Sequence, residues 1–255
     1  MSTNGTHNGN GHDPDRNDDD NDNVIRIPSL AERDKMRREA EEQARKEYRA
    51  ANPSEPMINL RPITKYLLLA LLVPHLIIEF LLSPPQQYWV IEHFGVIPSA
   101  YTVEFTGWQA IISPLTYMFL HASWLHIGMN AAMLVAFGAG LERWMGGIRM
   151  FAFFYISSIA AIIFHFIIAP TSPYVVIGAS GGISGLFAAV MIMLQSQGRM
   201  PLGKYGIWPF AAFWVLISFV FGLTGAPDGS NVAWAAHVGG FLFGLLFIKP
   251  FLKRF

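Results

Sequence analysis

The chain has 255 residues, 52% of them hydrophobic, a formal net charge of zero and no cysteine. The lack of cysteine excludes disulfides, a thiolate nucleophile and cysteine-ligated metals. The charges are uneven, because residues 1–65 carry 24 of the 36 charged side chains, and the rest of the chain has too few for the surface of a soluble domain. The composition therefore predicts a membrane protein with a polar N-terminal tail.

We place this polar tail at residues 1–60 and expect most of it to be disordered. Residues 1–27 are rich in Asp, Asn and Gly and contain little apolar surface to bury. Ser29 and Glu32 match a capping box, which predicts a short, charged, solvent-exposed helix over about 29–50. The beginning of the chain resembles neither a secretory signal nor a transit peptide, because it has no apolar core and many Asp residues.

From Tyr66 onward, the sequence contains six apolar segments of roughly membrane-spanning length. They lie near residues 66–83, 115–140, 148–169, 178–197, 207–224 and 232–250. The segments lack the alternating pattern of a membrane β-barrel, so only helices are plausible. We therefore expect an all-α membrane domain over residues 61–255.

The basic residues after Lys65 predict the orientation of this domain. With six spans, they all fall on one side of the membrane: Arg143, Arg149, Arg199, Lys204, Lys249, Lys253 and Arg254. The positive-inside rule makes that side cytoplasmic, so we expect both termini there. The aromatic connection at 84–114 is then outside and suits the headgroup zone. The glycine-rich connection at 222–231 is either a hinged lid or an ordinary turn.

Two segments carry stripes of small residues that predict close helix packing. In the fourth segment they are Ser180, Ser184 and Ala188, with Gly181, Gly185 and Ala189 beside them, and in the sixth they are Ala236, Gly240 and Gly244. Packing of the two stripes would bring His237 within reach of Ser180. A neutral histidine can take the proton of a serine and make it a nucleophile. The alternative is helix packing with an incidental hydroxyl and imidazole.

The other polar residues predict how the Ser180–His237 pair would work. Asp228 lies in a glycine-rich loop, so we favour a dyad over a triad. His126 and Asn130 share one helix face and, with the Ser180 N–H at a helix N-terminus, could stabilise an oxyanion. His121 would hydrogen-bond the aromatic loop. A metal site over these two histidines and Asn130 is the alternative, but Asn is a poor zinc ligand and no carboxylate completes the set, so we expect no metal or cofactor.

The remaining intramembrane polar residues have structural interpretations. His75 and Glu79 could form a proton relay, but we expect Glu79 at the outer interface and His75 hydrogen-bonded to a neighbour. We expect His165 at the interface. Glu142 and Arg143 suggest an ion pair or a helix anchor.

These residues also carry a family resemblance. His121, His126 and Asn130 resemble the H-x4-H-x3-N signature of rhomboid intramembrane serine proteases. Three further motifs are similar to those of the same family: Gly138–Arg143 to G-x-x-x-E-R, Gly178–Gly181 to G-x-S-G, and His237–Gly244 to H-x-x-G-x-x-x-G. The motifs follow in the family's order over residues 66–250.

The resemblance implies the six-helix rhomboid bundle, with Ser180 as nucleophile, His237 as general base, and His126, Asn130 and the Ser180 N–H as the oxyanion hole. It implies supporting roles for His121, Gly178, Gly181, Ser184, Gly240, Gly244, Glu142 and Arg143. The sequence departs from the family at two places. Ser184 occupies a position that is often aromatic in the family, and Trp108-Gln109 stands where the family has Trp-Arg.

We therefore expect an intramembrane serine endopeptidase that cleaves transmembrane protein substrates in the lipid bilayer, with no nucleic-acid partner. A different class of function is a catalytically silent rhomboid-like protein that binds or helps extract transmembrane helices. A transporter with a histidine relay fits the polar residues but not the Gly-Ala-Ser-Gly setting. The expected location is a bacterial inner membrane, with an organellar membrane as the alternative.

Overall fold

The computed structural model describes residues 29–51, 60–103, 107–199, 205–225 and 233–252. Helices account for nearly all the regular structure in these ranges, together with one isolated bridge between Val96 and Val176. The chain divides into two units, Met1–Glu55 and Pro56–Phe255, and each is described by itself. The predicted all-α class is confirmed.

The first unit contains helix α1 (Leu30–Ala51), which is the predicted charged helix. The Ser29 N–H donates to Glu32 Oε2 at 2.8 Å, and the Glu32 N–H donates to Ser29 Oγ at 3.3 Å. This reciprocal pair is the expected capping box. An i,i+4 ion pair joins Lys46 to Glu42 at 2.9 Å further along the helix. The disorder predicted for residues 1–27 concerns a segment outside the described residues.

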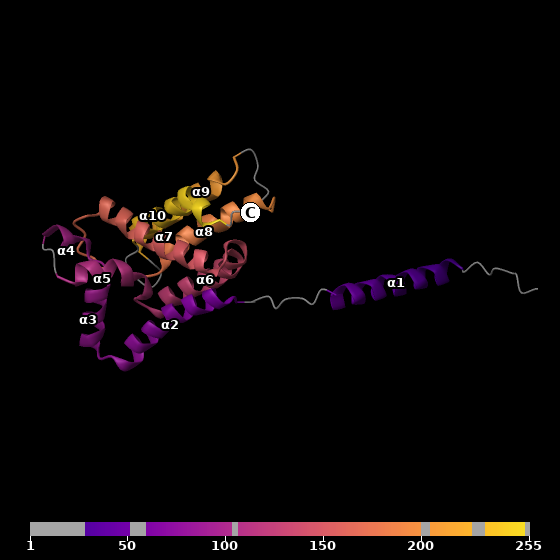
Figure 1. Cartoon of the computed structure of the whole chain (residues 1–255), viewed down its shortest axis with the longest axis horizontal. Coiled ribbons are helices and arrows are strands. Elements are labelled where there is room, and N and C mark those ends of the chain that lie inside the picture. Colours follow the sequence, from indigo (N-terminus) through magenta and orange to yellow (C-terminus); the bar gives the residue numbers. More distant parts are fainter. Residues whose placement is uncertain (1–28, 52–59, 104–106, 200–204, 226–232, 253–255) are drawn as a thin grey trace, which may run out of the picture. The chain divides into compact units, whose positions relative to one another are not determined.

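In the second unit, each of the six apolar segments contains a helix (Figure 1). Three are long and apolar enough to span a membrane: α2 (Pro62–Leu81), α6 (Trp124–Met145) and α7 (Gly147–Ile168). Three are shorter apolar helices: α8 (Ser180–Ser196), α9 (Trp208–Thr224) and α10 (Trp234–Phe247). The helical bundle therefore has the predicted elements in the predicted order.

The predicted second segment began too early. Helix α6 starts at Trp124, after Ser123, whose Oγ accepts the His126 N–H at 3.1 Å and caps the helix. The preceding residues belong to α5 (Gln109–Thr116), to the short 3-10 helix η1 (Tyr117–Phe119), and to an irregular link that contains His121. His121 is therefore not on the same helix as His126.

The connection at 84–114 is more ordered than the sequence suggested. It forms α3 (Pro84–Phe94), α4 (Pro98–Val103) and the beginning of α5. Ser83 and Gln86 make a second capping box, and Pro84 fits the first helical turn. The Tyr101 hydroxyl donates to the Ala110 carbonyl at 2.8 Å and joins α4 to α5. A position in the headgroup zone remains a prediction.

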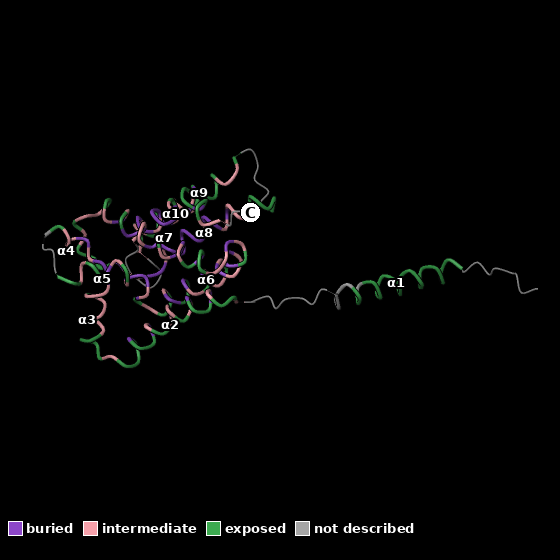
Figure 2. The backbone as a smooth tube through the Cα atoms, viewed as in Figure 1, coloured by how far each residue is buried: buried purple, intermediate pink, exposed green. Residues whose placement is uncertain are grey.

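Helices α7, α8 and α10 form the best-buried part of the second unit (Figure 2). A Cβ at Gly240 would overlap the Gly181 carbonyl oxygen, and a Cβ at Gly244 would lie 2.6 Å from the Gly185 carbonyl oxygen. The predicted packing of the two small-residue stripes is therefore confirmed. Backbone contact at this distance fixes α10 against α8, which matters because each helix carries one of the candidate catalytic residues.

Glu142 anchors the first helix of the bundle. Its carboxylate accepts the backbone N–H groups of Ile63 at 3.1 Å and Thr64 at 2.9 Å, and the Thr64 hydroxyl at 2.8 Å. These N–H groups belong to the first turn of α2, which has no partner for them within its own helix. A carboxylate at a helix N-terminus also interacts favourably with the helix dipole. The helix-anchor interpretation therefore describes Glu142.

Candidate functional site

The structure brings Ser180 and His237 together. Ser180 is the first residue of α8, and His237 lies in the first turn of α10. Their side chains meet at 2.8 Å between Ser180 Oγ and His237 Nε2. Both residues are half-buried. A hydroxyl at this distance from an imidazole nitrogen can pass its proton to the ring when it attacks a carbonyl group.

A tight backbone bend before α8 places Ser180 at this position. Val176 pairs with Val96 through two backbone hydrogen bonds, of 2.7 and 3.0 Å. Gly178 follows with φ of 114°, a conformation that favours glycine. The Gly178 N–H donates to the Tyr117 carbonyl at 2.9 Å. The chain then enters α8 with Ser180 exposed to the cavity described below.

His126 and Asn130 lie across from this bend, on the first two turns of α6. A Cβ at Gly178 would lie 2.7 Å from His126 Nε2, so the imidazole edge sits directly against the backbone of Gly178. Asn130 Nδ2 donates to the His126 carbonyl at 3.0 Å, and its amide has a second N–H for another acceptor. Both residues line the same cavity as Ser180.

This cavity has a volume of about 540 Å³ and is mainly apolar. It contains Ser180, His237, His126 and Asn130, with walls from α6, α8, α9, α10 and the link before α8. A mostly apolar cavity with a few convergent polar groups is the usual form of a substrate site. The arrangement can therefore hold an apolar chain with one carbonyl group near the serine.

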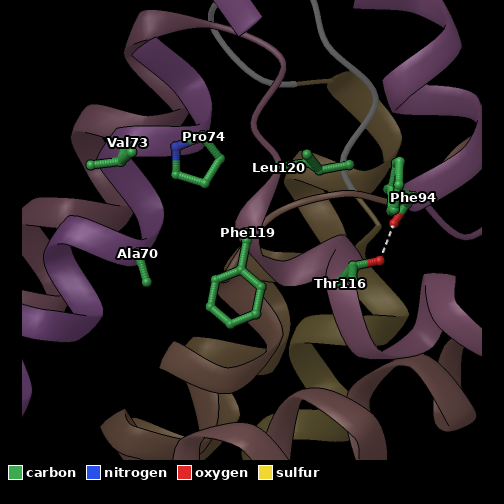
Figure 3. Close-up of a pocket in the computed structure, with 7 residues that line it drawn as sticks. All are labelled: Ala70, Val73, Pro74, Phe94, Thr116, Phe119 and Leu120. Carbon is green, nitrogen blue, oxygen red and sulfur yellow. Dashed lines mark hydrogen bonds between the residues drawn. The ribbon is translucent and has the colours of Figure 1, made fainter. Parts of the chain in front are cut away.

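A second cavity of about 380 Å³ lies between α2 and the region around η1 (Figure 3). Ala70, Val73, Pro74, Phe94, Thr116, Phe119 and Leu120 line it. The hydroxyl of Thr116, its one polar side chain, donates within the fold to the Phe94 carbonyl at 2.9 Å. This cavity offers no group for hydrolytic chemistry.

Ser184 is the other serine in the G-x-S-G pattern. It is buried, and its hydroxyl donates to the Ser180 carbonyl at 2.7 Å, within the same helix. The hydrogen bond to His237 is made by Ser180. The geometry therefore favours Ser180 over Ser184 as the partner of the imidazole.

Sequence reasoning missed Tyr117. This side chain is 1% exposed, and its hydroxyl donates to the Ser158 carbonyl of α7 at 2.6 Å, while its backbone carbonyl receives the Gly178 N–H. It therefore ties the bend before Ser180 to α7. A polar aromatic residue just before the histidine motif was the available signal. Trp214 and Ser218 of α9 also line the cavity, and no sequence motif marks them.

Two predictions about histidines were wrong. His121 and His75 are buried, and their ring nitrogens have no hydrogen-bond partner among the described residues, although a bond was expected for each. His165 is 8% exposed, because α7 packs against α8 and α10, and its place at the membrane interface remains a prediction. Glu79 is exposed and makes no hydrogen bond to the buried His75 among the described residues, and its place at the outer interface remains a prediction.

Three further expectations concerned a metal site, Asp228 with its glycine-rich connection, and Trp108. Within the described ranges, no three His, Asp or Glu side chains converge as metal ligands. Asp228 and most of the connection at 222–231 lie outside the described residues. Trp108 is half-exposed, and its ring packs against Phe94 with centroids 5.8 Å apart. That contact joins the end of α3 to the beginning of α5.

Comparison with known proteins agrees with the motifs. The Rhomboid domain family matches residues 108–254. The chain is 30% identical over 154 residues to the rhomboid-family protein YdcA of Bacillus subtilis, covering 58% of this chain and 71% of YdcA. It is 29% identical over 156 residues to RHOMBOID-like protein 6, mitochondrial, of Arabidopsis thaliana, covering 58% of this chain and 48% of that protein. It is 28% identical over 170 residues to the rhomboid protease AarA of Providencia stuartii, covering 57% of each.

Proposed function

Since the chain belongs to the rhomboid family and is a membrane-embedded helical protein, we propose that it is an intramembrane serine endopeptidase. Its substrates are transmembrane segments of other membrane proteins. The observation that carries this proposal is the 2.8 Å contact between Ser180 Oγ and His237 Nε2 inside an apolar cavity. The whole activity is assigned to this dyad.

The reaction follows from the positions of these groups. Ser180 Oγ attacks the scissile carbonyl carbon while His237 Nε2 accepts its proton. The imidazolium then gives that proton to the leaving amine, and water hydrolyses the acyl-enzyme with His237 again as base. No carboxylate bonds to His237 among the described residues, so helix packing must orient its ring. The close contact of Gly240 and Gly244 with α8 supports that orientation.

Negative charge develops on the carbonyl oxygen during the attack and needs donors. The N–H of Ser180 at the beginning of α8, the Nε2 edge of His126 and the free N–H of Asn130 are the three candidates. Preorganised donors in a site with little water stabilise such an oxyanion strongly, and removal of one typically costs about 10²–10³ in kcat. The proposal assigns this role to all three groups.

The cavity also indicates which substrates fit. Its apolar walls include Met129, Met133, Phe213 and Phe221. An intact helix uses its carbonyl groups in its own hydrogen bonds, so Ser180 can attack only a segment that unwinds. Segments with Gly, Ala or Pro near the cleavage point meet this requirement. The natural substrate therefore combines an apolar sequence with a weak point in its helix.

The topology belongs to the same proposal. The domain of residues 61–255 crosses a bacterial inner membrane six times, and the tail of residues 1–60 and the C-terminus are cytoplasmic. The basic connections on one side support this orientation through the positive-inside rule. Ser180 then lies toward the outer side, at the beginning of α8.

Purified full-length protein with a single-span model substrate tests the function. We expect cleavage by the wild type and by Ser184→Ala, and none by Ser180→Ala or His237→Ala. The Ser184→Ala variant is the matched control, since it makes the same substitution at a serine one helical turn further along α8. Cleavage by Ser180→Ala at the wild-type rate would refute the assignment. Substrate binding without cleavage by the wild type would instead indicate a catalytically silent rhomboid-like protein.

A further inference from the structure

Three histidines form a row between α2 and the proposed active site. They are His75 on α2, His121 in the link before α6, and His126 on α6. The ring centroids of His75 and His121 are 6.5 Å apart, and those of His121 and His126 are 5.1 Å apart. The rings meet edge to face, at 89° and 71°. Only His126 of the three lines the cavity of Ser180.

The two histidines of this row that lie outside the cavity of Ser180 have unmet hydrogen-bonding capacity. His75 and His121 are each 3% exposed. Across the described residues, none of their ring nitrogens finds a hydrogen-bond partner. A neutral imidazole has one donor and one acceptor, and leaving such a group unsatisfied in a buried place costs about 1–3 kcal/mol. The two rings therefore require a small polar partner.

Bound water fits this requirement best. Buried water usually makes two to four hydrogen bonds to otherwise unsatisfied polar groups, and two facing imidazoles offer that number of nitrogens. The Trp124 ring covers His75, against which it packs edge-on with centroids 4.7 Å apart. Phe80 in turn packs against Trp124 at 5.8 Å. These two aromatic rings therefore help to keep His75 buried.

We propose that His75 is a positioning residue: together with His121 it binds water that holds the His126 imidazole with its Nε2 edge toward Gly178. This inference rests on the proposed function, since the oxyanion role of His126 belongs to that proposal. His126 can donate to an oxyanion only when its Nε2 carries a proton, and the hydrogen bonds around a histidine decide which nitrogen is protonated. His75 acts on the site through His121 and the bound water, without touching substrate.

The simpler interpretation is that His75 only fills space between α2 and α6. A phenylalanine fills nearly the same space without any polar group to desolvate. His75→Phe and His75→Gln therefore separate the two ideas, because Phe keeps the ring and Gln keeps a donor and an acceptor. His93→Phe is the matched control: His93 also packs against a tryptophan, but its ring nitrogen is already bonded to the Trp89 carbonyl, outside the row.

For full-length protein and a single-span substrate, we expect His75→Phe to lower kcat about tenfold, the loss that one misplaced hydrogen bond produces. KM and the midpoint of thermal unfolding should stay close to the wild type. We expect His75→Gln to recover most of the rate and His93→Phe to leave it unchanged. A wild-type kcat in His75→Phe overturns the proposal, and so does an equal loss of kcat in His75→Gln.

A second measurement needs no cleavage. In Ser180→Ala protein labelled with ¹⁵N-histidine, the nitrogen shifts report which ring nitrogen of His126 carries the proton. We expect His126 to be one tautomer, protonated at Nε2, in the Ser180→Ala protein. In the double variant that also carries His75→Phe, we expect a mixture of the two tautomers. An unchanged His126 spectrum in the double variant overturns the positioning role. The proposed function fails separately, if Ser180→Ala protein still cleaves substrate.

Discussion

A methyl group added at Gly240 would overlap the carbonyl oxygen of Gly181, so α8 and α10 meet backbone to backbone at this point. On α8 the contact lies one residue from Ser180, and on α10 it lies about one turn from His237. The distance between the two candidate catalytic residues therefore depends on how closely two helices pack, in the absence of any bond from a carboxylate to the imidazole among the described residues.

The first prediction concerns this contact. Gly240→Ala should push α10 away from α8, because overpacking a well-filled interface costs about 1–3 kcal/mol. A misplacement of about 1 Å between reacting groups can cost about a hundredfold in rate. We expect a lower unfolding midpoint and a loss of cleavage of that order. Gly128→Ala is the control, since a Cβ there meets nothing within 4 Å; an equal loss in both variants would contradict the packing argument.

The second prediction separates Gly178 from other strained glycines. Gly178→Ala should reduce kcat about 10²–10³-fold, because the new methyl group displaces the His126 imidazole from its donor position. Gly198→Ala also places an alanine at a positive φ, of 64°, but its Cβ would meet open space. Each variant should lose about 1–3 kcal/mol of stability, and only Gly178→Ala should lose activity. Cleavage by Gly178→Ala at the wild-type rate would contradict the assignment of His126 to the oxyanion hole.

The third prediction concerns the anchor of α2. Glu142→Ala leaves two N–H groups and the Thr64 hydroxyl without their acceptor, and buried hydrogen bonds to a charged group contribute about 1.5–3 kcal/mol. Thermal unfolding in detergent should show a clear decrease in midpoint. Glu92→Ala should change it little, since Glu92 is exposed on α3. Equal midpoints for the two variants would be incompatible with an anchoring role.

The fourth prediction is a pH dependence in the first unit. The hydrogen bonds that Glu32 receives from the Ser29 backbone and, to a lesser extent, from the Ser29 side chain lower the pKa of the Glu32 carboxyl. A carboxyl group whose pKa is lower in the folded state stabilises the helix above its unfolded pKa, and this contribution is lost as pH falls through the folded pKa. NMR of the full chain should show α1 fraying at its N-terminus in that acid range. Ser29→Ala keeps the backbone donor and removes only the side chain, so the Glu32 pKa should rise part of the way to its ordinary value. Titration of Glu32 at an unchanged pH would contradict the contribution of the Ser29 side chain.

The sequence predicted the parts of this molecule that rest on local patterns. Hydropathy located the six apolar helices, and the i,i+4 stripes of α8 and α10 located the contact between Ser180 and His237. The capping box at Ser29 was also readable, because each of its two hydrogen bonds spans only three residues. The same signal at Ser83 and Gln86 would have revealed α3.

The sequence could not predict features that depend on long-range packing. Apolar composition alone did not separate η1 and the link at His121 from α6, since all three are hydrophobic. The burial of His165 depends on the helices that cover α7, and the role of Glu142 depends on a contact with Thr64, 78 residues away in the chain. The unsatisfied nitrogens of His75 and His121 likewise appear only once α2 and α6 are packed.

The most direct test of the central claim is covalent labelling by a fluorophosphonate, which reacts with an activated serine. Attack by Ser180 Oγ forms an O–P bond and releases fluoride, while His237 takes the hydroxyl proton. Mass spectrometry of digested full-length protein should find the adduct on Ser180 in the wild type and Ser184→Ala, and no adduct on Ser180 in His237→Ala. An adduct on Ser180 that forms equally fast without His237, or a wild-type protein labelled only at another serine, would contradict the account.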